Sequence, residues 1–350
     1  MSAAGFERVA VERGERSGRL MAVAVHSTVL GPALGGARLW DYAGDGEAVA
    51  DVKRLARAMT LKAAAAGLDL GGGKGVIAAP PGPAPTGTVR RSMLLDFGDL
   101  IESLDGSYVT AEDVGTGAAD MAVIAERTGH VVGLESAHGG SGDPSPITAL
   151  GVLAAIRACA TELRGTRELD GLRVCVVGLG HVGTHLAGLL ADAGAKLLVT
   201  DIDPARRPTA ERLGAAWVEP GHEIACECDV LAPCALGGLI GPDEARALRA
   251  SIVCGAANNV LTDDCVAELL DRRDVLYAPD FIANSGGLIS VYGELRGLPP
   301  ERATEMARAI EGAMTGVLGL ARERDVPPLQ AARRLALDRL ESEALVAAGA

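Results

Sequence analysis

The sequence predicts an α/β protein of two domains, an N-terminal α/β domain followed by a Rossmann-type, doubly wound parallel sheet. With 350 residues the chain is too long for a single domain of ordinary size, and its 48% of hydrophobic residues is enough for the cores of two domains. In the second half short apolar runs alternate with helical patterns, and a glycine fingerprint follows the first of these runs. We therefore expect domains at 1–143 and 144–325, and a C-terminal helix at 326–350 that packs back on the first domain.

Composition restricts the partners. A net charge of −13 and a pI near 5.0 argue against nucleic acid or an anionic membrane surface as a partner. The opening "MSAAGFERVAVERGER" mixes Glu and Arg, unlike a signal peptide, and no later window holds enough uninterrupted apolar residues to span a bilayer. Seven cysteines, all after position 158, follow no disulfide or zinc spacing, so we expect a cytoplasmic protein with reduced thiols and no metal.

In the first domain, "GRLMAVAVHS" (18–27) alternates like a strand, and residues 45–68 carry apolar side chains at helical spacing. "KGVIAAP" (74–80) reads as a short strand that a Pro-rich loop ends, and "GSYVTAED" (106–113) as another strand.

The second domain begins after the turn-forming segment 139–146, where Pro precedes a helical pattern. A strand, a helix, a strand and a helix follow at 172–180, 184–194, 195–203 and 204–214. Further strands are expected at 229–235, 251–258 and 275–283 with helices between them, and the chain is helical from about residue 299. This rhythm predicts a parallel sheet.

The first crossover of the second domain carries a dinucleotide fingerprint. In "VVGLGHVGTHL" the glycines and the first helical residues are Gly178, Gly180, His181, Val182 and Gly183. Glycine permits the tight turn, and the helix N-terminal N–H groups meet the charge of a pyrophosphate. Asp201 ends the next strand, 18 positions after Gly183 (201 − 183), where an acid binds the adenosine ribose hydroxyls. Because a carboxylate there repels a 2′-phosphate, the expected cofactor is NAD.

Ionisable residues of the first domain lie among glycines. In "LDLGGGKG" (68–75) three glycines lead into Lys74, Lys62 lies at the end of the helical pattern, and Asp113 follows a strand. We expect the glycines to form an ordered turn and the three side chains a pocket in which one ammonium lowers the pKa of the other. Such a lysine can act as a base near neutral pH. The alternative is that Lys62 and Lys74 are solvated surface charges. The neighbouring glycines argue against this, because a surface lysine does not need them.

Six motifs carry a family resemblance: "GPALGG.R", in which the last letter is Arg38, "LGGGKG", "AEDVGT", "APCALGG", "GAANN" and "YAPDFIANSGG". From Gly31 to Glu294 the chain resembles the leucine, phenylalanine and valine dehydrogenases, relatives of glutamate dehydrogenase. The resemblance implies reversible oxidative deamination of an L-amino acid to a 2-oxo acid and ammonia. It also implies an N-terminal substrate domain, a C-terminal NAD domain and catalysis in the cleft between them.

By resemblance, Lys62 binds the substrate carboxylate, Lys74 activates the attacking water and Asp113 shuttles protons. Asn258 is implied to hydrogen-bond the substrate carboxylate beside the nicotinamide, and Thr148 to contact the nicotinamide amide. Further implied substrate-binding residues are Leu34, Gly35, Gly36, Leu288 and Val291.

The implied substrate side chain is apolar. Leu34 stands where glutamate dehydrogenases carry a lysine, and Val291 stands where they carry a hydroxyl. Leu288 is bulkier than the residues common at its position, which favours branched aliphatic substrates; a phenylalanine preference is the alternative. Two departures from the family pattern are Ala37, in place of a Thr near the pocket, and Ser285, in place of an Ala.

Two other classes of protein remain as alternatives. A non-catalytic NAD sensor would lack the lysines or Asp113, and a hydroxy-acid dehydrogenase would offer a catalytic pair of His and acid, for which His26 and His138 have no obvious partner. The N-terminal arm is short, so the number of subunits is open, with a closed homo-oligomer as the default. The sequence also leaves open which apolar amino acid is preferred and in which direction the reaction runs.

Overall fold

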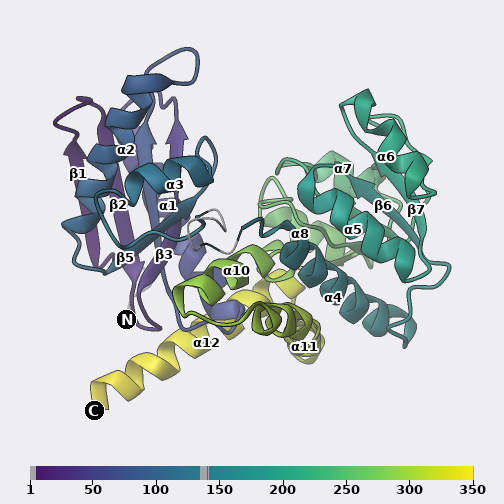
Figure 1. The fold of residues 1–350 in the computed structure, drawn as a ribbon. Coiled ribbons are helices and arrows are strands. Elements are labelled where there is room, and N and C mark those ends of the chain that lie inside the picture. Colours follow the sequence, from purple (N-terminus) through teal and green to yellow (C-terminus); the bar gives the residue numbers. More distant parts are fainter. Residues whose placement is uncertain (1–4, 135–139, 141, 350) are drawn as a thin grey trace. The chain divides into compact units, whose positions relative to one another are not determined.

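The computed structural model describes residues 5–134, 140 and 142–349, which divide into two compact units. Unit 1 contains the chain up to Asp143, residues 291–298 and the chain from Ala336 on. Unit 2 contains residues 144–290 and 299–335. Each unit is built on one β-sheet with helices against it (Figure 1).

Unit 1 has a five-stranded mixed sheet in the order β1-β2-β4-β3-β5. Its elements are β1 (Arg8–Arg13), β2 (Leu20–Ser27), β3 (Ala33–Trp40), α1 (Asp45–Ala65), β4 (Gly71–Ala78), α2 (Gly87–Glu102), β5 (Tyr108–Glu112) and α3 (Ala118–Ile124). β1 and β4 pair antiparallel with β2. β3 pairs parallel with β4 on one side and with β5 on the other. The sequence analysis missed β1 because this edge strand is mostly exposed and lacks a clear apolar alternation.

Alternate residues of the central strands point to opposite faces of this sheet. Met21 and Val23 of β2 pack into a core with Phe97 of α2, whereas Ala22 and Ala24 pack into a second core with α1. Both faces are therefore covered, which explains why β2 is buried along most of its length.

The glycine run before Lys74 is part of strand β4, so the expected turn is wrong. Gly72 faces α1, where a Cβ would lie 2.1 Å from the backbone nitrogen of Thr60. Gly73 faces the other way, where a Cβ would lie 2.6 Å from the ring of Tyr108. The glycines let helix and aromatic ring approach the strand from both sides, so they shape the scaffold under Lys74.

Unit 2 has a six-stranded sheet of parallel pairs in the order β11-β10-β9-β6-β7-β8. Its strands are β6 (Arg173–Val177), β7 (Lys196–Thr200), β8 (Ala216–Trp217), β9 (Val230–Pro233), β10 (Ile252–Val253) and β11 (Leu276–Tyr277). Its longer helices are α4 (Ser145–Arg164), α5 (His181–Asp192) and α11 (Pro300–Arg324). Shorter ones are a 3₁₀ turn (Pro204–Arg206), α6 (Arg207–Arg212), α7 (Pro242–Ala247), α8 (Cys265–Asp271) and α9 (Asp280–Ala283). The strand order is that of a Rossmann fold, with its reversal between β6 and β9.

Three expectations for the second half need correction. The strand expected at 275–283 ends at Tyr277, and after Pro279 the chain forms α9. Residues 291–298 belong to unit 1, because α10 (Gly286–Leu295) leads into contacts such as Arg296 Nη2 to the carbonyl of Asp69, at 3.1 Å. Within the described residues, α4 is long and apolar enough to cross a membrane, although it is mostly buried against α5 and α11.

The last helix, α12 (Pro328–Gly349), begins in unit 2 and continues in unit 1. Its residues Ala336 and Leu340 pack with Leu30 and Ala64, and Arg339 donates to the carbonyl of Leu68 at 2.8 Å. These contacts tie the second half of α12 to the end of α1 and to the loop before β4.

We predict that Gly72→Ala destabilises unit 1 by about 3 kcal/mol or more, because the new Cβ meets helix backbone that cannot move aside cheaply. Gly46→Ala is the matched control, since a Cβ there meets nothing within 4 Å. Urea unfolding of both variants checks this; equal midpoints for the two would contradict the packing role of Gly72.

Candidate active site

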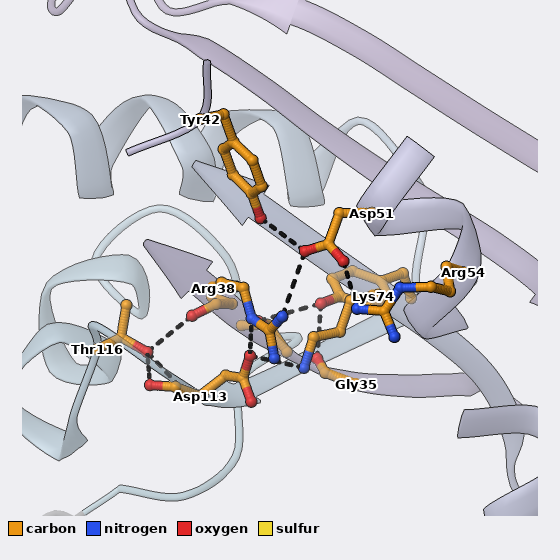
Figure 2. A network of polar contacts seen from close by, with 11 residues as sticks. Gly35, Arg38, Tyr42, Asp51, Arg54, Lys74, Asp113 and Thr116 are labelled. Carbon is orange, nitrogen blue, oxygen red and sulfur yellow. Dashed lines mark hydrogen bonds and ion pairs between the residues drawn. The ribbon is translucent and has the colours of Figure 1, made fainter. Parts of the chain in front are cut away.

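Lys74 lies in the middle of β4 with its side chain on the α1 face of the sheet. Its exposed fraction is only 5%, and its Nζ lies 2.9 Å from Oδ2 of Asp113 (Figure 2). Asp113 directly follows β5, two strands away in the sheet. The sheet therefore joins two residues that are 39 positions apart (113 − 74) in the sequence.

Gly36 makes room for this pair. A Cβ on Gly36 would lie 2.7 Å from Cβ of Asp113 and 2.5 Å from the carbonyl of Glu112. The backbone of Asp113 is fixed by Thr116, whose Oγ1 accepts from the Asp113 N–H at 2.9 Å and donates to the carbonyl of Ala37 at 2.8 Å. The carboxylate is thus held over β3 beside Lys74.

Arg38 is a third member of the site, and the sequence analysis gave it no role. Its Nε donates to Oδ2 of Asp113 at 2.9 Å, and its Nη1 donates to Oδ2 of Asp51 on α1 at 3.2 Å (Figure 2). Asp51 also accepts from the hydroxyl of Tyr42 at 2.9 Å and from Arg54 at 2.6 Å. The signal that could have found Arg38 is its place two residues after Gly36 on the same strand face.

The charges of this cluster shift one another's pKa values. Burial lowers the pKa of Lys74; the carboxylate of Asp113 opposes this and Arg38 adds to it, and the pKa stays below the usual lysine value. Burial alone would raise the pKa of Asp113, but the charges and hydrogen bonds of Lys74 and Arg38 outweigh it and lower that pKa. Lys74 is therefore suited to lose a proton and Asp113 to remain ionised.

The predicted coupling of two lysines is not what shifts the pKa of Lys74. Burial is the main cause, and the nearby cation that adds to it is Arg38, where the sequence analysis expected Lys62. Lys62 lies half-buried in the last turn of α1. The chain has only four lysines, at positions 53, 62, 74 and 196, among 33 basic residues. Arginine does not titrate in proteins, so among the basic residues of this site Lys74 is suited to proton transfer and Arg38 is not.

The neighbouring residues of β3 divide between the two faces. Leu34 pairs with Gly72 and so shares the face of Lys74, where it is buried. Gly35 accepts a hydrogen bond from the hydroxyl of Tyr108 at 2.6 Å through its carbonyl. Ala37, one of the two departures from the family pattern, points into the opposite core and away from Lys74.

In unit 2 the glycine fingerprint and Asp201 lie together. Gly178 has φ +101°, and a Cβ on Gly183 would lie 1.9 Å from the carbonyl of Gly178. Gly180, at the N-cap of α5, faces open space and offers no side chain to the N–H groups of His181 and the next residues. Asp201 accepts from the backbone N–H of Leu179 at 2.7 Å. The loop fits a nucleotide pyrophosphate at the helix N-terminus beside an acidic residue.

A second group in unit 2 centres on two asparagines. Nδ2 of the buried Asn284 donates to Oδ1 of the exposed Asn258 at 2.9 Å, so the amide nitrogen of Asn258 faces away from this bond. Asn284 has no signal of its own in the sequence apart from its place in "IANSGG". The buried hydroxyl of Ser285 donates to the carbonyl of Ile282, and Thr148 packs against Gly286. The hydroxyl of Ser285 is therefore used in a local hydrogen bond to the backbone.

The remaining predicted residues are placed as follows. Leu288 is buried in unit 2, whereas Val291, three residues later on α10, is half-buried and belongs to unit 1. Val182 lies half-buried in the first turn of α5. Nδ1 of His26 lies 2.9 Å from Oγ1 of Thr60, and His138 lies outside the described residues.

Comparisons with known families agree with the two units. Residues 10–130 match the model of the "Glu/Leu/Phe/Val dehydrogenase, dimerisation domain", and residues 208–347 match "Glutamate/Leucine/Phenylalanine/Valine dehydrogenase". Residues 156–236 match the NAD-binding domain of D-isomer specific 2-hydroxyacid dehydrogenases, which overlaps the glycine fingerprint.

Individual relatives match over almost the whole chain. Leucine dehydrogenase of Thermoactinomyces intermedius is 41% identical over 96% of this chain and 91% of its own. Valine dehydrogenase of Streptomyces virginiae is 42% identical over 96% of this chain and 94% of its own. The crystal structure of L-tryptophan dehydrogenase from Nostoc punctiforme is 35% identical, with a TM-score of 0.86 over 97% of both chains.

Proposed function

Since the chain belongs to the glutamate/leucine/phenylalanine/valine dehydrogenase family, we propose that it catalyses NAD-dependent oxidative deamination with Lys74 and Asp113 as its proton-transfer groups. The enzyme is an oxidoreductase of apolar amino acids. The observation that carries the proposed mechanism is the 2.9 Å contact between the buried Lys74 ammonium and the Asp113 carboxylate.

The side chains of unit 1 suit the proton transfers of this reaction. The nicotinamide supplies the acceptor for the hydride that leaves the α-carbon. Lys74, as the amine, takes a proton from the water that adds to the α-carbon of the iminium. The Asp113 carboxylate takes a proton from the substrate ammonium before the hydride leaves, and returns it to the amino nitrogen of the carbinolamine. The hydroxyl proton of the carbinolamine then passes to the Asp113 carboxylate as the C–N bond breaks, so that ammonia leaves and the 2-oxo acid remains. Lys62 and the amide of Asn258 are the groups we assign to the substrate carboxylate, with Gly35 and Gly36 lining the site.

The nucleotide loop of unit 2 supports NAD as the cofactor. Gly178, Gly180 and Gly183 suit the pyrophosphate, and Asp201 suits the ribose hydroxyls. Both carboxylate oxygens of Asp201 already accept backbone N–H groups, from Leu179 and Asp203, which fixes the negative charge at this place. We assign Thr148 to the nicotinamide amide.

Two properties of the site support a branched aliphatic substrate. Leu34 shares the buried face of Lys74, so a second carboxylate on the substrate would find no partner from this residue. Leu288 and Val291 offer only hydrocarbon, and the bulk of Leu288 disfavours a large ring. The alternative of an aromatic substrate is favoured by the likeness to an L-tryptophan dehydrogenase.

We further propose that the enzyme works in the cytoplasm as a closed homo-oligomer. All seven cysteines are free thiols, which suits a reducing compartment. The family model matched by residues 10–130 is described as a dimerisation domain, which supports self-association through unit 1.

We predict that kcat/KM for L-leucine or L-valine exceeds that for L-glutamate by about a thousandfold or more. A buried carboxylate without a partner costs several kcal/mol, and each 1.4 kcal/mol is about a factor of ten. The measurement is NADH absorbance with leucine, valine, phenylalanine, tryptophan and glutamate under one condition. Glutamate at parity with the best apolar substrate would refute the proposed pocket, whereas tryptophan or phenylalanine as the best would refute only the aliphatic preference.

We also predict that NAD is strongly preferred over NADP, and that Asp201→Asn narrows the difference by removing the repulsion of the 2′-phosphate. Comparing kcat/KM for the two nucleotides in wild type and variant checks this. An unchanged ratio in the variant would remove Asp201 from the ribose site. Glu211→Gln, on the exposed face of α6, is a control for the loss of one negative charge in unit 2.

A further inference from the structure

We propose that Arg38 is a positioning residue of this reaction, whose permanent charge holds the Asp113 side chain in place and favours its carboxylate form between proton transfers, while Lys74 gains and loses its proton. The inference rests on the proposed roles of Lys74 and Asp113. Arg38 itself exchanges no proton and, in this account, acts on the substrate only through Asp113.

The two cations share one oxygen of Asp113. Lys74 Nζ and Arg38 Nε each lie 2.9 Å from Oδ2, and Oδ1 has no hydrogen-bond partner among the described residues. Arg38 and Lys74 come from neighbouring strands, β3 and β4, and converge on the carboxylate from one face of the sheet (Figure 2). The carboxylate is thus clamped through Oδ2 and leaves Oδ1 to exchange a proton with the substrate.

The reaction creates a charge problem that Arg38 solves. Before Lys74 accepts a proton from water it must be a neutral amine, and at that moment Asp113 loses one of its two cations. A carboxylate that is largely buried, with an exposed fraction of 21%, would be costly there without any partner. The guanidinium of Arg38 cannot be deprotonated, so one cation always remains. The same charge disfavours a second cation nearby and so favours the neutral form of Lys74.

Arg38 is itself held in a fixed position. Its planar fork spans two carboxylates, with Nε on Asp113 and Nη1 on Asp51 of α1. A lysine at this position would keep the charge but could not make both contacts in this geometry. The ionisable groups of the cluster, from all the elements that meet here, are Lys74, Asp113, Arg38, Asp51, Tyr42, Arg54 and the buried Tyr108.

The test compares Arg38→Gln and Arg38→Lys with wild type in the dependence of kcat/KM on pH, with L-leucine and NAD. Without the charge of Arg38, Lys74 and Asp113 both keep their protons to higher pH, so the ascending limb of the Arg38→Gln profile moves to higher pH. The loss is about 10²-fold at neutral pH and shrinks as pH rises. Arg38→Lys keeps the limb near its wild-type position while lowering the maximal rate.

Arg16→Gln is the matched control, because Arg16 also pairs with a buried aspartate of unit 1, Asp96 at 2.8 Å, but does not contact Asp113 or Lys74. Its limb should coincide with that of wild type. A purely structural role of Arg38 predicts an equal loss at every pH, and an unshifted limb in Arg38→Gln overturns the proposal. If Arg38→Gln does not fold, a shifted limb in Arg38→Lys overturns it instead.

The failure of the proposed function would look different. It would appear as absence of amino acid oxidation by the wild type, or as substantial activity of Lys74→Ala. A wild type that is active and depends on Lys74, with an Arg38→Gln profile that is only scaled down, would refute the role of Arg38 alone.

Discussion

The buried ion pair between Lys74 and Asp113 is the constraint that the strands and glycines of unit 1 have to meet. A lysine with a 5% exposed fraction is tolerated only because a carboxylate lies 2.9 Å from its Nζ. Gly36 lets Asp113 lie over β3 within reach of Lys74, and Gly72 lets α1 lie close to the face of β4 on which Lys74 stands. The glycine-rich motifs are therefore the steric conditions for a buried charge cluster.

Unit 2 uses glycine for a different purpose. There Gly178 adopts a left-handed backbone conformation and Gly180 leaves open space at the start of α5, as an approaching anion requires. The same residue type thus serves close packing within the protein in one unit and access for a ligand in the other. A Cβ added at Gly72 would collide with the backbone of Thr60, whereas a Cβ added at Gly180 would meet no atom within 4 Å.

Much of this organisation could be predicted from the sequence. The parallel sheet of unit 2 follows from alternating elements, and the nucleotide loop from the spacing of its glycines and Asp201. The turn expected at Gly71–Gly73 was wrong, because local patterns cannot show that α1 and Tyr108 press on a strand from both sides. Arg38 was missed for a similar reason: its partners, Asp113 and Asp51, are distant in sequence and meet it only in the folded sheet. The end of β11 was missed because "VLYAPDFIA" is apolar apart from Asp280, and the pattern of so short a run does not distinguish its helical part from a strand.

Lys74 is, by this proposal, the titrating base of the enzyme. Since the chain has only four lysines, the Cε signal of Lys74 in ¹³C-lysine-labelled protein can be assigned by comparison with Lys74→Ala. We expect Lys74 to lose its proton below the usual lysine range, at the same pH at which kcat/KM for L-leucine reaches half of its maximum, because that profile reports the free enzyme. A Lys74 that is still protonated at a pH where kcat/KM is already maximal would contradict the account.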